Sequence, residues 1–145
     1  MHHQRRVVCT LAALVFPLIG SLAVVRGDDD KSKRPSLSLK VTPPMAVAPA
    51  RVRAAVEVRG GANDYEEFYC PTVEWDWGDE TISEATLDCE PYEPGRSTIR
   101  RRFNGDHTYQ TSGNYKVTFR LKRKSKVITS TSANVQIRPG MTEPF

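Results

Sequence analysis

Apolar and polar residues alternate along most of the chain after residue 35. Five segments carry an apolar or β-branched side chain at every second position, and they are 36–41, 51–58, 73–77, 115–122 and 127–137. A period of two places alternate side chains on opposite faces of an extended strand, one face buried and one exposed. The pattern therefore predicts five β-strands, and no stretch of useful length has the period of a helix.

Prolines end the first predicted strand and indicate that the next segment lies at the edge of a sheet. Pro43 and Pro44 close the first strand, and Pro49 follows soon after. Because proline cannot donate a hydrogen bond to a ladder, residues 45–48 are predicted to lie at the edge of a sheet.

The middle of the chain has a less regular pattern. Residues 81–95 include two prolines and a glycine and are predicted to be irregular. Residues 98–103 are predicted to form a short strand, and the Asn-Gly-Asp sequence at 104–106 a turn. Several short strands separated by turns predict an all-β, antiparallel sandwich or barrel.

The first 27 residues have the pattern of a secretory signal peptide. Residues 7–25 contain no charged side chain, Arg5 and Arg6 precede them, and three aspartates follow at 28–30. This arrangement is typical of a cleaved signal, although an apolar stretch of this length can also span a membrane. The prediction is a secreted, extracellular or periplasmic protein, with membrane anchoring by residues 7–25 as the alternative. The predicted units are a signal peptide at 1–27, a linker at 28–35, a β-domain at 36–139 and a tail at 140–145.

The cysteines narrow the chemistry further. Cys9 falls in the predicted signal, which leaves Cys70 and Cys89 as an even pair in an exported chain. Disulfides form in the compartments that such chains reach, and loop closure between these positions is worth about 3 kcal/mol. A metal site that included His107 would lack a fourth ligand. The sequence therefore predicts a disulfide between Cys70 and Cys89.

Two motifs resemble those of a known family. Trp75-Asp76-Trp77-Gly78-Asp79 resembles the first signature of PKD domains, which are Ig-like β-sandwiches of secreted and cell-surface proteins. His107-Thr108-Tyr109, followed by Gly113-Asn114-Tyr115, resembles the second signature. The resemblance spans about residues 37–137 and implies an Ig-like antiparallel β-sandwich whose fold these motif residues help to shape.

The resemblance implies structural roles for the motif residues. Trp75 is expected to fill the core between the sheets, and Asp79 to accept backbone N–H groups in a turn. His107 and Tyr109 are expected in the turn before the strand at 115, with the tyrosine hydroxyl bonded to the backbone. This sequence departs from the family where Glu80 replaces the usual glycine, and the segment that follows is longer than usual.

The charges are unevenly distributed along the chain. There are 21 Lys and Arg against 17 Asp and Glu, but removal of the first 27 residues would leave 18 against 17. The basic balance therefore belongs largely to the predicted signal and does not indicate nucleic-acid binding. From Glu57 to Glu93 there are 12 acids and one base, and from Arg96 to Arg138 there are 11 bases and one acid.

These opposite blocks have two interpretations besides solvation. Glu74 and Asp76 are placed to pair with Lys116 and Arg120 across neighbouring strands. The other interpretation is a basic strip that binds an anionic surface polymer, such as an acidic polysaccharide or lipid headgroups. The candidate residues of the strip are Arg100, Arg101, Arg102, Lys122, Arg123, Lys124 and Lys126.

No catalytic site is predicted, and the chain is interpreted as not being an enzyme. The one histidine after the predicted signal, His107, already has a role in the motif. Paired carboxylates leave a small hydrolase as a third alternative. No cofactor is predicted apart from calcium, for which Asp64, Asp79 and Glu80 are candidate oxygen ligands.

The sequence thus predicts an exported, non-catalytic binding or adhesion module that engages a protein or a polysaccharide at the cell surface or in the periplasm. The expected contacts are the basic strip and the loop at 81–97. The alternative is a structural spacer or envelope-assembly subunit that acts through a sheet edge. Nucleic acid is not an expected partner, and a membrane is expected only through an uncleaved N-terminal segment.

Overall fold

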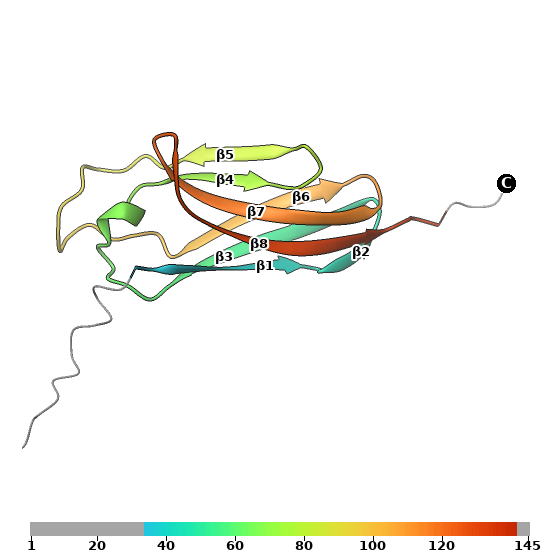
Figure 1. The fold of residues 1–145 in the computed structure, drawn as a ribbon, viewed down its shortest axis with the longest axis horizontal. Coiled ribbons are helices and arrows are strands. Elements are labelled where there is room, and N and C mark those ends of the chain that lie inside the picture. The colour runs from blue at the N-terminus through green and yellow to red at the C-terminus, as the bar shows by residue number, and fades with distance from the viewer. Residues whose placement is uncertain (1–33, 142–145) are drawn as a thin grey trace, which may run out of the picture.

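The computed structural model describes residues 34–141, and the regular secondary structure of this part is almost wholly β-strand (Figure 1). The strands are β1 (Ser36–Thr42), β2 (Met45–Val47), β3 (Ala50–Arg59), β4 (Thr72–Asp76), β5 (Ile82–Thr86), β6 (Arg102–Tyr109), β7 (Gly113–Arg123) and β8 (Lys126–Arg138). One 3-10 turn, η1 (Glu66–Phe68), lies between β3 and β4 within this part.

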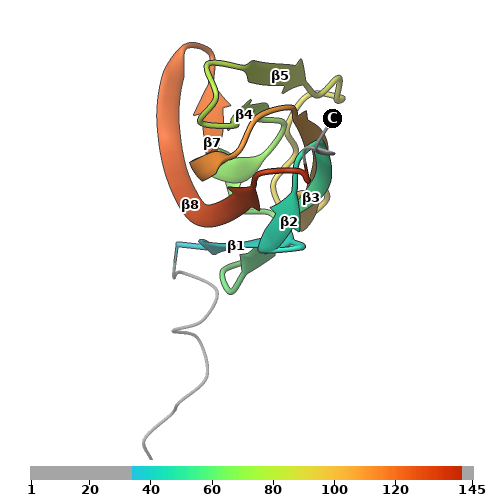
Figure 2. The same ribbon diagram turned by 90° about the vertical axis from the view of Figure 1, so that its right-hand side faces the viewer.

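The strands form two sheets that pack face to face (Figure 2). One sheet has the order β1-β3-β6, and the other has the order β2-β8-β7-β4-β5. All neighbours are antiparallel except β2 and β8, which run parallel. The predicted all-β, Ig-like sandwich is confirmed, and β2 lies at a sheet edge as its prolines required.

Alternate residues of both sheets form the core. Val56 on β3 is 2% exposed, and Phe119 on β7 is fully buried. Trp75 on β4 is buried as predicted, with its ring 4.6 Å from that of Phe119 between centroids. Burying a large apolar side chain contributes about 1.5–3 kcal/mol, so the period-two positions supply the attraction between the sheets.

One predicted strand is displaced along the chain. The strand expected at 98–103 is instead β6, and it passes straight through the turn expected at 104–106. These residues pair with β3 in an unbroken antiparallel register. As a consequence His107 and Tyr109 lie on a strand, and the expectation that they occupy the turn before β7 is wrong.

The glycine that suggested a turn has a packing role instead. A Cβ atom on Gly105 would lie 3.0 Å from the Trp75 ring and 3.1 Å from the Trp77 ring. Those contacts are closer than an alanine side chain tolerates without movement of the indoles. Gly105 therefore lets β6 approach the two tryptophans of the facing sheet.

The segment predicted to be irregular contains a further strand. β5 pairs antiparallel with β4 along its whole length and ends the five-stranded sheet. All five of its residues are exposed. A strand without a buried face needs no alternation of apolar and polar residues, which is the pattern that predicts the other strands. The remainder of the predicted irregular segment, residues 87–95, has no regular secondary structure, and neither do residues 98–101, which were predicted to begin a strand.

The N-terminal predictions concern residues outside the described part. The signal peptide, the alternative anchor at 7–25 and most of the predicted linker lie before residue 34, and most of the tail lies after residue 141. Between residues 34 and 141, no helix is long and apolar enough to cross a membrane.

Candidate functional site

The two sequence motifs meet between the sheets. The Tyr109 hydroxyl on β6 donates a 2.7 Å hydrogen bond to the carbonyl oxygen of Trp77, just beyond β4. Tyr109 is fully buried, and burial raises the pKa of its hydroxyl, which therefore remains a donor. The Trp77 indole N–H in turn donates to Ser83 Oγ on β5 at 3.1 Å. The first bond joins the two sheets, the second links Trp77 to β5 within the five-stranded sheet, and both have a structural role.

A second network closes the turn between β4 and β5. The Thr81 hydroxyl and backbone N–H donate to Asp79 Oδ1, and His107 Nε2 lies 2.7 Å from Asp79 Oδ2. The His107 ring stacks on Trp77 with centroids 4.8 Å apart. Burial alone would raise the pKa of Asp79, but the hydrogen bonds from Thr81 and His107 outweigh it and lower the pKa. Glu80, in place of the family's glycine, has a φ of 70°.

This network predicts a dependence of stability on acid. Because the pKa of Asp79 is lower in the folded protein than in the unfolded chain, its contribution is present at neutral pH and is lost as the pH falls below about 4. We expect Asp79→Asn to lower the free energy of unfolding at pH 7 by about 1–2 kcal/mol. The variant should also lose less stability than the parent between pH 5 and pH 2, measured by urea denaturation across that range.

The matched control for this measurement is Asp88→Asn. Asp88 is exposed and its side chain makes no hydrogen bond within residues 34–141. We expect this variant to keep the acid dependence of the parent. Equal pH profiles for the Asp79 variant and the parent would show that the Asp79 carboxylate does not hold the turn.

On the outer face of the five-stranded sheet, Glu74 and Asp76 pair with Arg120 as predicted, whereas Lys116 has no ion pair within residues 34–141 and Lys122 pairs with Glu74 instead. Arg120 lies 2.7 Å from Glu74 and 3.2 Å from Asp76. Lys122 lies 2.8 Å from Glu74 and 2.7 Å from Glu84. Hydrogen bonds from Lys122 and Arg120 lower the pKa of Glu74, and the bonds to Glu74 and Glu84 raise the pKa of Lys122. Lys122, a candidate of the basic strip, is therefore engaged within the sheet.

The first half of the predicted strip is also engaged. Arg101 donates to the carbonyl oxygens of Gly61 and Ala62 and to Asn63 Oδ1, the last at 2.8 Å, and so supports the loop after β3. Arg100 donates to the backbone and lies over the Phe103 ring at 5.4 Å. Arg102 points to the outer face of the three-stranded sheet. The seven predicted residues therefore do not form one strip.

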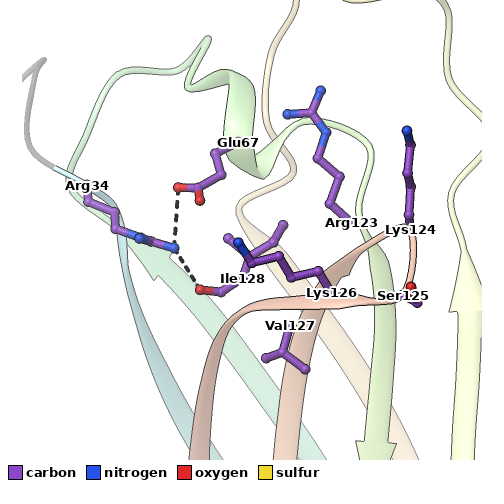
Figure 3. Close-up of a pocket in the computed structure, with 8 residues that line it drawn as sticks. All are labelled: Arg34, Glu67, Arg123, Lys124, Ser125, Lys126, Val127 and Ile128. Carbon is purple, nitrogen blue, oxygen red and sulfur yellow. Dashed lines mark hydrogen bonds and ion pairs between the residues drawn. The ribbon is translucent and has the colours of Figure 1, made fainter.

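The remaining strip residues gather at a groove of about 700 Å³ beside the β7–β8 turn (Figure 3). Its basic side chains are Arg34, Arg123, Lys124 and Lys126. Arg34 comes from the segment before β1, and its guanidinium donates to the Ile128 carbonyl oxygen at 2.7 Å. The groove is thus built by three parts of the chain that are far apart in sequence: Arg34, Glu67 in η1, and residues 123–128.

The groove carries an excess of positive charge. Arg34 lies 3.3 Å from Glu67, and Arg123 lies 3.5 Å from Glu66. Lys124 and Lys126 make no ion pair with any residue between 34 and 141. Arg123 and Lys124 extend from the hairpin end in Figure 3, where the Lys126 amine points toward the Arg34 side. Two uncompensated ammonium groups in a hollow suit an anionic ligand.

The sequence predicts the turn between β7 and β8 but not the residues that line the other side of the groove. Arg34 falls in the segment predicted to be a linker, and Glu67 falls in a segment with no predicted element. No local pattern connects either residue with position 124. Pairing of β1 with β3 and the contact of β1 with β8 bring Arg34 to this place.

Two of the three calcium candidates are used in separate local contacts, and Glu80 is exposed and makes no side-chain hydrogen bond within the described residues. Asp64 Oδ2 accepts from the Gly95 backbone N–H at 2.9 Å, whereas Asp79 pairs with Thr81 and His107. Within the described residues no three His, Cys, Asp or Glu side chains gather as a metal site would require.

Comparisons with known proteins give likenesses of fold. No protein-family model matches the sequence, and no curated protein does. The structure is similar to the PKD domain of an M14-like peptidase from a Thermoplasmatales archaeon, with a TM-score of 0.49 and 13% identity, covering 72% of this chain and 97% of that one. It is also similar to a CARDB domain from Pyrococcus furiosus, with a TM-score of 0.45 and 10% identity, covering 73% of this chain and 96% of that one.

Proposed function

We propose that this chain is an exported, non-catalytic binding module that engages an acidic polysaccharide at the cell surface or in the periplasm. The observation that carries the proposal is the basic groove at the β7–β8 turn, where Lys124 and Lys126 are without an acidic partner among the described residues. Such cations form charge-assisted hydrogen bonds with carboxylate or sulfate groups, which are the strong class of hydrogen bond.

The walls of the groove also suit a sugar. Val127 is 46% exposed, and Ile128 lies beside it in the lining. Sugar rings present apolar C–H faces together with hydroxyls, so a lining of aliphatic and basic side chains can contact both the ring and its acidic substituent. Ser125 adds a hydroxyl that can donate to or accept from the ligand.

The proposal includes export of this chain and its lack of catalytic activity. The disulfide between Cys70 and Cys89 is typical of proteins that fold in an oxidising compartment. In each carboxylate pair that suggests a hydrolase, at least one acid has a basic partner: Glu66 and Glu67 pair with Arg123 and Arg34, Asp79 with His107, and Glu93 with Arg96. Glycoside hydrolysis needs both carboxylates of a pair directed at the scissile bond.

The test compares a groove variant with a control of equal charge change. Purified protein is titrated onto immobilised polygalacturonate at about 50 mM and about 500 mM salt, a range over which exposed charges become screened. We expect Lys124→Ser with Lys126→Ser to weaken binding about tenfold or more at low salt, equivalent to ~1.4 kcal/mol. The control is Lys116→Ser with Arg138→Ser, which removes two exposed bases elsewhere on β7 and β8.

The control variant should bind like the parent to within about twofold, or ~0.4 kcal/mol. High salt should weaken the parent and the control together. Equal losses in both double variants would mean that net charge, rather than the groove, determines binding. Salt-resistant binding of the parent would contradict an ionic ligand altogether.

A second candidate function is supported by β5. This strand ends the five-stranded sheet, and its Ile82 side chain is 63% exposed. An open edge of this kind can accept a strand from a partner protein. Binding to envelope proteins that resists salt and is removed by Ile82→Arg would favour this function over the groove.

A further inference from the structure

The outer face of the three-stranded sheet carries a second concentration of basic residues. Lys40 on β1, Arg51, Arg53 and Arg59 on β3 and Arg102 on β6 lie at outward positions of the strand alternation. Two acids, Glu57 and Asp106, share this face. Only Arg102 of these residues belonged to the predicted strip, because the face is assembled from three strands far apart in sequence.

Each acid on this face is shared by two arginines. Glu57 lies 2.8 Å from Arg59 and 3.6 Å from Arg102. Asp106 lies 3.1 Å from Arg53 and 3.9 Å from Arg51. A guanidinium has five N–H donors. Because each of these arginines shares its carboxylate with a second arginine, most of its donors remain available to a ligand. The four arginine side chains are 64–80% exposed.

Small residues separate the charged ones and leave two hollows. Ala55 lies at the centre, with Lys40 as its neighbour on β1 and Asn104 as its neighbour on β6. The hollow above it, of about 380 Å³, is also lined by Arg59 and Arg102. A second hollow of about 390 Å³ lies farther along β3, between Arg51, Arg53 and Asp106.

Apart from Ala55, the uncharged outward positions on this face carry hydroxyl or amide side chains. Ser38 and Asn104 flank the first hollow, and Thr42 lines the second. Single-stranded nucleic acid is usually held by aromatic rings that stack on the bases, and no aromatic side chain lines either hollow. Hydroxyl and amide groups among arginines instead match a ligand rich in hydroxyls and acids.

We propose that this face is a binding surface for a linear acidic polysaccharide lying along β3, with an acidic sugar seated over Ala55 between Lys40 and Arg102. This inference rests on the proposed function for the class of ligand and adds a surface that the groove does not contain. The outward residues of β3 are spaced by about 6.8 Å per pair of residues, so Arg53 and Arg59, three such steps apart, lie about 20 Å apart and can contact separate acidic units of one polysaccharide chain. Because Ser36 pairs with Arg59, the face ends near Arg34 and therefore near the groove.

The experiment blocks the hollow without changing the core. Ala55 is half-exposed and points outward, so Ala55→Glu places a carboxylate where the ligand's acid would lie. Lys40→Glu is the second variant, since Lys40 makes no ion pair with any described residue. The controls are Ala55→Ser, which keeps the hollow open, and Lys116→Glu, which makes the same charge change on the other sheet. Thermal unfolding checks that each variant is folded.

Binding to immobilised polygalacturonate and dextran sulfate is measured by biolayer interferometry, with neutral dextran and single-stranded DNA as comparison surfaces. We expect Ala55→Glu and Lys40→Glu each to weaken binding to the acidic polysaccharides about tenfold. Ala55→Ser and Lys116→Glu should remain within about twofold of the parent. A preference for the uronate or for the sulfated polymer would identify the acidic group.

The outcomes separate this surface from the groove. Parental binding by both face variants would overturn the inference, whatever the groove variant shows. Loss in the face variants with parental binding by the Lys124 and Lys126 variant would support the face and contradict the proposed role of the groove. Equal affinity for neutral dextran, or tighter binding to DNA, would overturn the assignment to an acidic polysaccharide.

Discussion

Replacing Trp77 by alanine is expected to lower the free energy of unfolding by about 3–5 kcal/mol, the usual cost of removing a large buried aromatic side chain. Trp77 is 1% exposed, and its ring lies between Trp75 and His107 with centroids 5.6 Å and 4.8 Å away. The substitution removes both stacking contacts and leaves Ser83 Oγ without its indole donor. Neighbouring strands on both sides restrict how far the site can collapse.

Urea denaturation followed by far-ultraviolet circular dichroism measures this loss. The control is Val47→Ala on β2, where the side chain is 53% exposed and a change within about 0.5 kcal/mol is expected. Tyr109→Phe gives an intermediate case, because it removes the donor to the buried Trp77 carbonyl and should cost about 1–3 kcal/mol. A loss below about 1 kcal/mol in the Trp77 variant would contradict its place in the core.

These residues explain why the two motifs occur together in one sequence. The first motif lies at the end of β4 in the five-stranded sheet, and the second begins with His107-Thr108-Tyr109 on β6 in the three-stranded sheet and continues at the start of β7. The Tyr109 hydroxyl and the His107 ring both reach across to the Trp77 region. The motifs therefore act as one connection between the sheets, and their resemblance to a family concerns the fold rather than a ligand.

The strands that could be predicted are those with one buried face. The side chains of β3 and β7 alternate between the core and the solvent, and their sequences alternate largely between apolar and polar residues for that reason. β5 has no buried residue and left no such pattern. At Gly105 the local signal was misleading, because a glycine between Asn and Asp favours a turn and here serves close packing against two indoles.

The candidate binding surfaces were harder to predict than the fold. Clusters of bases along the sequence suggested one strip, but Arg101 is turned to backbone carbonyls and Lys122 to acidic partners. The basic residues that make no ion pair within residues 34–141 lie on different strands, such as Lys40 on β1 and Lys126 on β8. Strand pairing and the packing of the two sheets bring such residues together, and neither is visible in a local run of charge.

Removing the disulfide is the second substitution expected to have a large effect. The bond between Cys70 and Cys89 joins residues 19 apart, and loop closure in the unfolded chain makes such a bond worth about 3 kcal/mol. We therefore expect Cys70→Ser with Cys89→Ser to lower the free energy of unfolding by about that amount, measured by urea denaturation without reductant.

The folded state of this variant should nevertheless stay close to that of the parent. Ile99 is buried, Tyr92 donates to the Asp64 carbonyl oxygen at 2.6 Å, and Tyr69 donates to the Glu90 carbonyl oxygen at 2.8 Å, so the segment after β5 has anchors of its own. Binding to polygalacturonate should accordingly be unchanged, since the disulfide lines neither the groove nor the face.

Reductant provides the internal control for the disulfide. Dithiothreitol should lower the stability of the parent to that of the double variant and leave the double variant unaffected. If the variant matched the parent in stability, the bond would not be constraining the unfolded chain. If the variant lost polysaccharide binding while remaining folded, the long segment near Cys89 would itself contact the ligand, as the sequence had suggested for residues 81–97, and the ligand surface would extend beyond the basic residues described above.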